Sequence, residues 1–405
     1  MNPAVQEYFQ KSTASFSAEP GNFNNSFFDT KRDFRPDQPE SKTITVACLN
    51  NKDLTLDVKC PGSKWLNYKK TVSVEGGEYT FTLTNLVPGV TYKYKVRQGG
   101  KLLSSGSLLA EGPIRMITLE KGFNIRDLGG WKGLGGKTVR YGQLYRGGSL
   151  GGTDMDGKES SLPQADIDEL QRLGVRAHLD LRAETNGGLY AREHSLHSYS
   201  AGHTTFNADF NNTRTDNGAY NRDGSVISDM AWIIYELKKG NPVYFNCRQG
   251  ADRTGTIAFV VEGLLGCYEY NTEAGGNQMA MDYELTGFSG ANYVDNIPVR
   301  SSSRPARDAF NNRGKLFRQL LELEAPEEDI KLETLQQRCY YYLNRYTGIG
   351  DASDWPHIDS KDLDWFIRFM LGLSNTEYAS ARPAWAQPGG ELKHIAESHA
   401  NVVKY

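Results

Sequence analysis

The chain has 405 residues, which is long enough for two or more domains with substantial cores. Its formal net charge of −3 gives no electrostatic reason to expect nucleic acid or an anionic membrane as the main partner. The sequence contains no run of about 18 apolar residues, so it predicts no transmembrane segment.

Residues 1–42 are polar with interspersed phenylalanines, and their lack of periodicity predicts either an extended segment that packs its aromatic rings onto a neighbouring domain or a partly disordered leader. The first residues have neither the basic nor the apolar region of a signal peptide. We therefore expect a soluble protein of unknown location, either cytoplasmic or exported, for example to the periplasm, with its signal peptide absent from this sequence. The five cysteines are too few for a disulfide scaffold, although Cys48 and Cys60 would be able to pair in an exported protein.

Residues 43–112 contain short β-prone runs separated by paired glycines, which predicts a small all-β sandwich. The stretch 86–92 is similar to the E–F corner of a fibronectin type III domain. This resemblance implies that Tyr92, at the start of a strand, bonds back to the backbone upstream. We expect the domain to be a spacer or a binding module, because nothing in it suggests catalysis.

Residues 113–380 alternate strands with helices, the pattern of an α/β domain, and residues 381–405 form a C-terminal tail. The predicted strands are 139–145, 175–181 and 243–245, and the predicted helices are 163–173, 230–237, 324–345 and 362–373. This pattern predicts a central sheet flanked by helices.

A strand at 243–245 leads into the loop Cys247–Arg253, and an apolar helical segment follows from Thr254. Strand, loop and helix in this order aim backbone N–H groups and the positive end of a helix dipole at one point, where an anion binds. The same dipoles favour a thiolate at Cys247. Arg253 adds a planar guanidinium suited to phosphate oxygens. Together these features predict phosphoryl transfer to sulfur.

The spacing of a cysteine and an arginine six residues later is weak evidence by itself, and Cys339 with Arg345 has the same spacing. That second segment contains three tyrosines and no glycine, so it predicts a helix rather than an anion-binding loop. The Cys247 segment instead has Gly250 in mid-loop.

The loop resembles the signature of cysteine-dependent protein tyrosine phosphatases, above all a bacterial branch that includes mycobacterial enzymes active on phosphotyrosine and phosphoinositides. Further similar stretches occur in the family's order at 124–130, 144–150, 180–182 and 282–285, and the likeness covers about residues 115 to 375. It implies a tyrosine-phosphatase-like fold, a phosphorylated substrate and no cofactor. It also implies that Cys247 is the nucleophile and that the phosphate is bound by Arg248, Gln249, Gly250, Ala251, Asp252, Arg253 and Thr254.

Two positions depart from the family. Asn246 stands where a histidine usually precedes the nucleophile, which leaves room for a catalytically silent, ligand-binding protein. Ala251 stands where phosphoinositide-active relatives often have a lysine, which weakens the case for a lipid phosphate. With 22 Tyr and 17 Phe and no second basic cluster near the loop, the sequence favours phosphotyrosine over inositol phosphates or phosphoinositides as the substrate.

Three aspartates are candidates for the general acid. Asp209 lies 38 residues before Cys247, where the wider superfamily has a mobile acid loop, and is the first candidate. Asp252, inside the phosphate-binding loop, is second, and Asp180, at the end of a strand, is the remaining one. Each also has a structural interpretation, as a loop cap, a hydrogen-bond acceptor and an ion-pair partner respectively.

Several polar residues keep two interpretations. Thr254 either donates its hydroxyl to the Cys247 sulfur or caps the helix, and Arg126 and Arg146 either brace the sheet or touch the substrate. The seven histidines form neither H-E-x-x-H nor a zinc-binding spacing with cysteine pairs, so no metal site is predicted.

Overall fold

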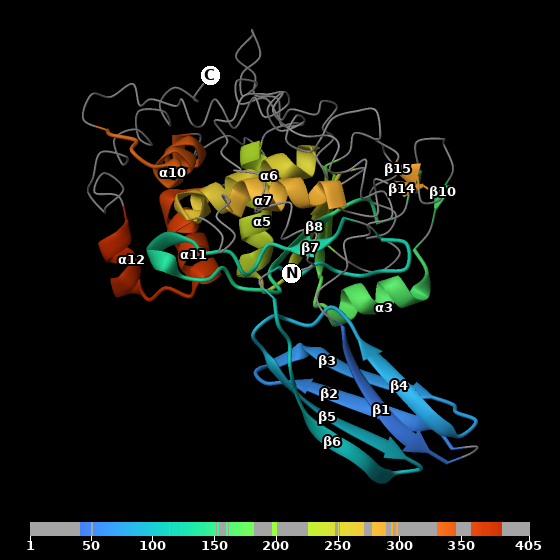
Figure 1. The fold of residues 1–405 in the computed structure, drawn as a ribbon. Helices are drawn as coiled ribbons and strands as arrows, with labels where there is room; N and C mark the ends of the chain where they lie inside the picture. The colour runs from blue at the N-terminus through green and yellow to red at the C-terminus, as the bar shows by residue number, and fades with distance from the viewer. Residues whose placement is uncertain are drawn as a thin grey trace.

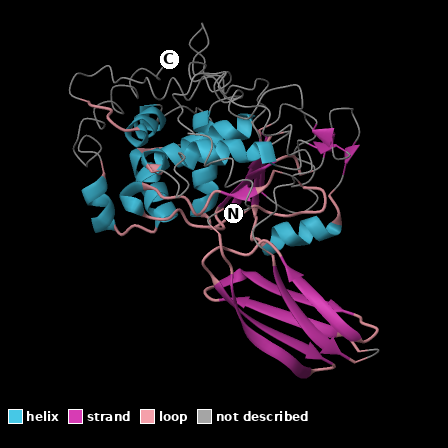
Figure 2. Cartoon of the chain, viewed as in Figure 1, coloured by secondary structure: helices cyan, strands magenta, loops and turns pink. Residues whose placement is uncertain are grey.

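The computed structural model describes residues 41–49, 52–112, 114–122, 124–150, 152–153, 159–160, 162–181, 197–200, 226–247, 250, 252–270, 278–288, 293–294, 297–298, 330–345 and 358–382. Figure 1 shows two groups of elements, an N-terminal β domain and a larger unit in which helices surround a central sheet. Figure 2 shows the same division by secondary structure, with the helices drawn there all in the larger unit.

The β domain consists of two antiparallel sheets, one formed by β1 and β4 and the other in the order β3-β2-β5-β6. Its strands are β1 (Lys42–Cys48), β2 (Leu54–Cys60), β3 (Ser63–Val72), β4 (Gly77–Leu83), β5 (Thr91–Gln98) and β6 (Lys101–Leu109). In β2 every second side chain, Leu54, Leu56 and Val58, is at most 1% exposed and points into the shared core. The prediction of a small β domain is confirmed.

The turn between β4 and β5 contains the hydrogen bond expected at this corner. The backbone N–H of Val87 donates to the hydroxyl of Tyr92 over 2.9 Å, and Tyr92 is 1% exposed. The likeness to fibronectin type III itself stays a prediction. Cys48 and Cys60 are both free thiols.

The larger unit is built on a five-stranded sheet in the order β12-β11-β13-β8-β7, with β13 in the centre. Its strands are β7 (Arg126–Asp127), β8 (Leu144–Gly147), β11 (Ala177–Asp180), β12 (His197–Ser200) and β13 (Val243–Asn246). The pairs β12–β11, β11–β13 and β13–β8 are parallel, and β7 is antiparallel to β8. The carboxyl ends of four strands therefore lie along one edge.

Alternating side chains of this sheet enter two cores. Val243 and Phe245 belong to the larger core, which α5, α6, α10 and α11 cover, whereas Tyr244 belongs to a smaller core with side chains of α3. The helices are α3 (Gln164–Arg172), α5 (Val226–Lys238), α6 (Asp252–Leu264), α7 (Gln278–Glu284), α10 (Leu335–Arg345), α11 (Ser360–Leu371) and α12 (Asn375–Ala381). Shorter elements are β9 (Gly152–Thr153), β10 (Glu159–Ser160), β14 (Tyr293–Val294), β15 (Ile297–Pro298), η1 (Leu134–Gly136), η2 (Cys267–Glu269) and η3 (Leu285–Phe288). The predicted α/β fold is confirmed.

The C-terminal helices α11 and α12 begin with capping residues, and α11 ends at a glycine. Asp359 caps α11 and exchanges hydrogen bonds with Asp362 in a capping box, while Gly372 ends the helix in the left-handed region at φ 64°. Ser374 and Glu377 form the same box at the start of α12. Within the described part of the chain, no helix has the length and apolar character needed to cross a membrane.

Two predicted elements were too long. The predicted strand 139–145 is wrong at its start, because β8 begins only at Leu144 and Gly142 turns the chain at φ 76°. The predicted helix 324–345 is wrong over residues 330–334, which precede α10 without helical structure. Cys339 lies inside α10 and is 0% exposed, which agrees with the helical interpretation of that segment.

Candidate functional site

The central strand β13 delivers the candidate nucleophile to the carboxyl edge of the sheet. Cys247 follows β13 directly, and α6 begins at Asp252. Ligand sites in α/β sheets form at this edge, where strand ends and helix N-termini meet. Cys247 is 4% exposed and belongs to the larger buried core, so its side chain does not lie on the surface.

A hydrogen bond closes the loop between Cys247 and α6. The backbone N–H of Cys247 donates to Oγ1 of Thr254 over 2.6 Å, and Thr254 is 0% exposed. Thr254 is the third residue of α6, so its hydroxyl oxygen fixes the strand end to the first helical turn and does not occupy the N-cap position. Donation of the hydroxyl hydrogen to the Cys247 sulfur stays a prediction.

Arg253 and Asp180 lie at the same sheet edge. Nη1 of Arg253 donates to the carbonyl oxygen of Leu181 over 3.4 Å, and Leu181 follows β11. Asp180 is the last residue of β11, is paired in register with Asn246 and is 1% exposed. The structure thus brings a thiol, a guanidinium and a buried carboxylate to one edge.

Two glycines allow close packing where the loop meets strand β8. Gly250 has φ +68°, and a Cβ there would lie 2.3 Å from the backbone carbon of Gly147. Gly147 is packed as tightly, because a Cβ there would lie 2.3 Å from the hydroxyl of Tyr244. Both positions exclude any side chain.

Asn246, the residue before Cys247, is bonded to a histidine on the neighbouring strand β11. Nδ2 of Asn246 donates to the carbonyl oxygen of Cys247 over 3.0 Å, and its Oδ1 lies 2.5 Å from Nε2 of His178. Because an amide oxygen only accepts, Nε2 of His178 must carry the proton of this bond. The sequence analysis missed His178, because polar and apolar residues alternate in the predicted strand 175–181 and nothing local distinguishes His178 from Arg176 or Asp180.

A buried charge cluster lies beneath the loop. Asp282 binds Nε of Arg126 over 2.7 Å and also pairs with Nη1 of Arg146, and all three side chains are at most 1% exposed. Arg126 further donates to Oδ1 of Asn124 over 2.6 Å. Both arginines therefore brace the interior in this structure, the first of their two predicted interpretations.

Ionisation within this cluster follows from its burial. Burial, and then the negative charge of Asp282, raise the pKa of Glu262 well above its usual range. Burial alone would raise the pKa of Asp282, but the charges of Arg126 and Arg146 outweigh it and lower that pKa. Burial, and then the charge of Arg146, lower the pKa of Arg126 to about 10.

The other predicted site residues are only partly visible. Asp252 is the first residue of α6, and its side chain is outside the description. Arg248, Gln249 and Ala251 of the loop, and the acid candidate Asp209, also lie outside the described residues.

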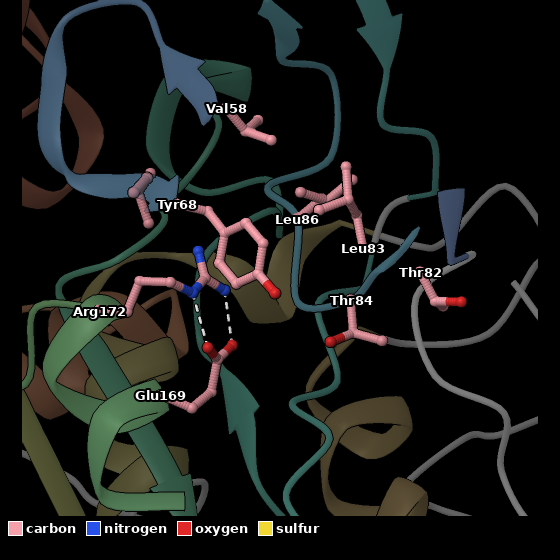
Figure 3. Close-up of a pocket in the computed structure, with 9 residues that line it drawn as sticks. Val58, Tyr68, Thr82, Leu83, Thr84, Leu86, Glu169 and Arg172 are labelled. Carbon is pink, nitrogen blue, oxygen red and sulfur yellow. Dashed lines mark hydrogen bonds and ion pairs between the residues drawn. The ribbon is translucent and has the colours of Figure 1, made fainter. Parts of the chain in front are cut away.

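A pocket lies between the β domain and α3 (Figure 3). Its lining comprises Val58, Leu66, Tyr68, Thr82, Leu83, Thr84, Leu86, Glu169 and Arg172. The guanidinium of Arg172 binds both carboxylate oxygens of Glu169, at 2.5 and 2.6 Å, and lies 5.7 Å from the ring centre of Tyr68. Arg172 and Glu169 already pair with each other, so we assign this pocket to the interface between the β domain and α3 rather than to the functional site.

A central parallel strand followed by a buried cysteine, a glycine-containing turn and a helix carrying an arginine is the arrangement with which α/β proteins bind anions at a sheet edge. The model of the tyrosine phosphatase family matches residues 117–337, which is more than half of the chain, and the matched range includes this site. The chain belongs to the tyrosine phosphatase family, which places it among the phosphatases. No curated protein matches the chain.

Proposed function

We propose that the protein is a cysteine-dependent phosphomonoester hydrolase that acts on phosphotyrosine. The sulfur of Cys247 attacks phosphorus, the S–P bond forms and the bond to the leaving oxygen breaks. Arg253 and the backbone N–H groups of the loop stabilise the charge on the phosphoryl oxygens. Water then attacks the phosphocysteine and releases phosphate and the thiolate.

One observation carries this proposal. The backbone N–H of the buried Cys247 is hydrogen-bonded to Thr254 in the first turn of α6, and the guanidinium of Arg253 lies at the same edge of the sheet. The remaining loop residues, Arg248, Gln249, Gly250, Ala251, Asp252 and Thr254, are proposed to surround the phosphate. Asp209 or Asp252 is proposed to protonate the leaving oxygen. Asp180, at 1% exposure, suits a structural role better.

Hydrolysis of p-nitrophenyl phosphate by the wild type and by Cys247→Ser tests the mechanism. The wild type should turn over the ester and, after acid quenching, carry one phosphoryl group on Cys247 by mass spectrometry. Cys247→Ser should lose turnover and keep phosphate binding. If the wild type binds phosphate but is inactive, the protein is instead a catalytically silent, phosphate-binding member of the family. The native Asn246, at the position where a histidine is usual, is compatible with that alternative.

A substrate panel tests the preference for phosphotyrosine. Phosphotyrosine peptides should be hydrolysed with a higher kcat/KM than inositol phosphates or phosphoinositides, because the chain is rich in aromatic residues and has Ala251 rather than lysine in the loop. A reversed order would identify the protein as an inositol phosphate or phosphoinositide phosphatase.

We also propose that residues 43–112 form a fibronectin type III-like module and that residues 113–380 form the phosphatase domain. The hydrogen bond from Val87 to Tyr92 supports the first assignment. The family match over residues 117–337 supports the second.

A further inference from the structure

The carbonyl group of Gly250 is held from below. Nη2 of Arg146 donates to this carbonyl oxygen over 2.9 Å, and Arg146 is 0% exposed on strand β8. Among the side chains that the structure describes, that of Arg146 therefore joins the phosphate-binding loop to the buried charge cluster. Substrate has no access to it.

Asp282 fixes the position of Arg146. One carboxylate oxygen of Asp282 pairs with Nη1 of Arg146, and the other accepts from Nε of Arg126 over 2.7 Å. The carbonyl oxygen of Asp282 also accepts from Nη2 of Arg126 over 2.6 Å. The guanidinium of Arg146 is thus held on one side by a carboxylate and presents its remaining edge to the loop.

The direction of the Gly250 carbonyl matters for anion binding. A trans peptide group is planar, and its N–H points opposite to its C=O. In a loop that binds an anion through its N–H groups, the carbonyl groups must therefore point away from the anion. Two guanidinium groups, those of Arg126 and Arg146, share the carboxylate of Asp282 beneath the loop.

We propose that Arg146 is a positioning residue, which keeps the loop in its phosphate-binding conformation by holding the carbonyl of Gly250. The proposal rests on the proposed function, since it concerns the same loop. A residue that only braced the sheet would change the stability of the protein and leave the phosphate affinity of the folded protein unaltered.

Arg146→Lys and the matched control Arg126→Lys separate these two roles. Both variants weaken the bonds to Asp282, but only Arg146 contacts Gly250, and a lysine cannot serve the carboxylate and the carbonyl with a planar fork. Isothermal titration of the full chain with inorganic phosphate should give at least a tenfold weaker Kd for Arg146→Lys and less than about a threefold change for Arg126→Lys. The rate of Cys247 alkylation by iodoacetate, with and without phosphate, gives a second readout that does not depend on turnover.

Arg146→Met covers the case in which Arg146→Lys does not fold. It removes the contact with Gly250 but leaves Asp282 paired with Arg126, so neither remaining charge of this pair is left buried without a partner. It should fold, as judged by circular dichroism, and bind phosphate at least about ten times more weakly.

Each outcome decides the matter. Wild-type affinity in either folded Arg146 variant would overturn the positioning role, even if the wild type hydrolyses phosphate esters. A wild type that binds phosphate without turnover would refute the proposed function, and the affinities of the variants would still decide the role of Arg146. Failure of the wild type to bind phosphate, or of both Arg146 variants to fold, would overturn the positioning role as well.

Discussion

At the scale of single residues, the identity of the general acid is open to direct measurement. Asp209→Asn or Asp252→Asn, whichever removes the acid, should lower kcat by about 100-fold on phenyl phosphate, a poor leaving group. The loss should be much smaller on p-nitrophenyl phosphate, because that leaving oxygen needs no proton. Asp180→Asn is the control, and an equal loss on both esters would remove the substituted residue from the candidates.

Gly250 is a second residue with a sharp expectation. Gly250→Ala would place a methyl group 2.3 Å from the backbone of Gly147 and also strain a residue at φ +68°, so the free energy of unfolding should fall by about 3 kcal/mol. Gly135→Ala is the matched control, because Gly135 has φ +66° and nothing within 4 Å of a Cβ. The control should lose only about 1 kcal/mol in urea unfolding. Equal losses would show that the contact with Gly147 has no energetic weight.

At the scale of elements, the buried charge cluster joins the sheet to α6 and α7, and it makes the free energy of unfolding depend on pH. The pKa of Glu262 is higher in the folded protein than its ordinary value of 4.5, which applies to the unfolded chain. The folded state therefore binds more protons, and the unfolding free energy should fall as pH rises above about 4.5, by up to about 1.4 kcal/mol per pH unit until the raised pKa is passed.

Glu262→Gln, which stays neutral, should remove this slope, so urea unfolding of both proteins between pH 5 and pH 8 tests the expectation. The other groups that face Glu262 are Asp282, Arg126, Arg146 and Cys267. None of them alters the comparison: the pKa of Asp282 is lowered, the pKa of Arg126 is about 10 and that of Cys267 is raised. Parallel curves for the two proteins would contradict the raised pKa of Glu262.

Local patterns predicted several elements well, because their signals lie within a few residues. Helix α3 ends near Gly174 as expected, and α11 has its polar cap and its terminal glycine in the sequence. The start of α10 had an equally local signal that the sequence analysis missed. Thr334 and Gln337 form a capping pair, in which the backbone N–H of Gln337 donates to the hydroxyl oxygen of Thr334 over 3.2 Å.

Long-range pairing explains most of what local patterns did not predict. The backbone N–H of Val139 bonds to Trp131, and that of Arg140 bonds to Met370 in α11, so this β-prone run is used outside the sheet. The functional site likewise has a part that local patterns predict and a part that depends on long-range contacts. The nucleophile loop was readable because its residues are consecutive, whereas the bond from Arg126 to Asp282 joins residues 156 positions apart.

At the scale of the whole molecule, Asn85 joins the two domains. In the left-handed region at φ 57°, its side chain accepts from the amide of Thr118 over 2.6 Å and donates to Glu169 over 2.5 Å. Asn85→Ala should lower the unfolding free energy by about 3 kcal/mol. It should also split a single calorimetric transition into two, because the domains would then unfold separately.

Asn67→Ala is the control for this prediction. The side chain of Asn67 bonds only to the amide of Cys60 among the described contacts, inside the β domain. This variant should destabilise the protein without adding a transition. Two transitions already present in the wild type would contradict the coupling of the domains.

The guanidinium of Arg115 has a practical consequence for anyone who shortens the gene. Arg115 is 0% exposed and donates to the backbone oxygen of Asn85 from both Nε, over 3.2 Å, and Nη2, over 2.7 Å, while Nη1 reaches Asp127 at 2.8 Å. A recombinant fragment that started at residue 113 would lack Asn85 and leave these two donors without their acceptor. The upstream strands should therefore be retained whenever the phosphatase half is purified.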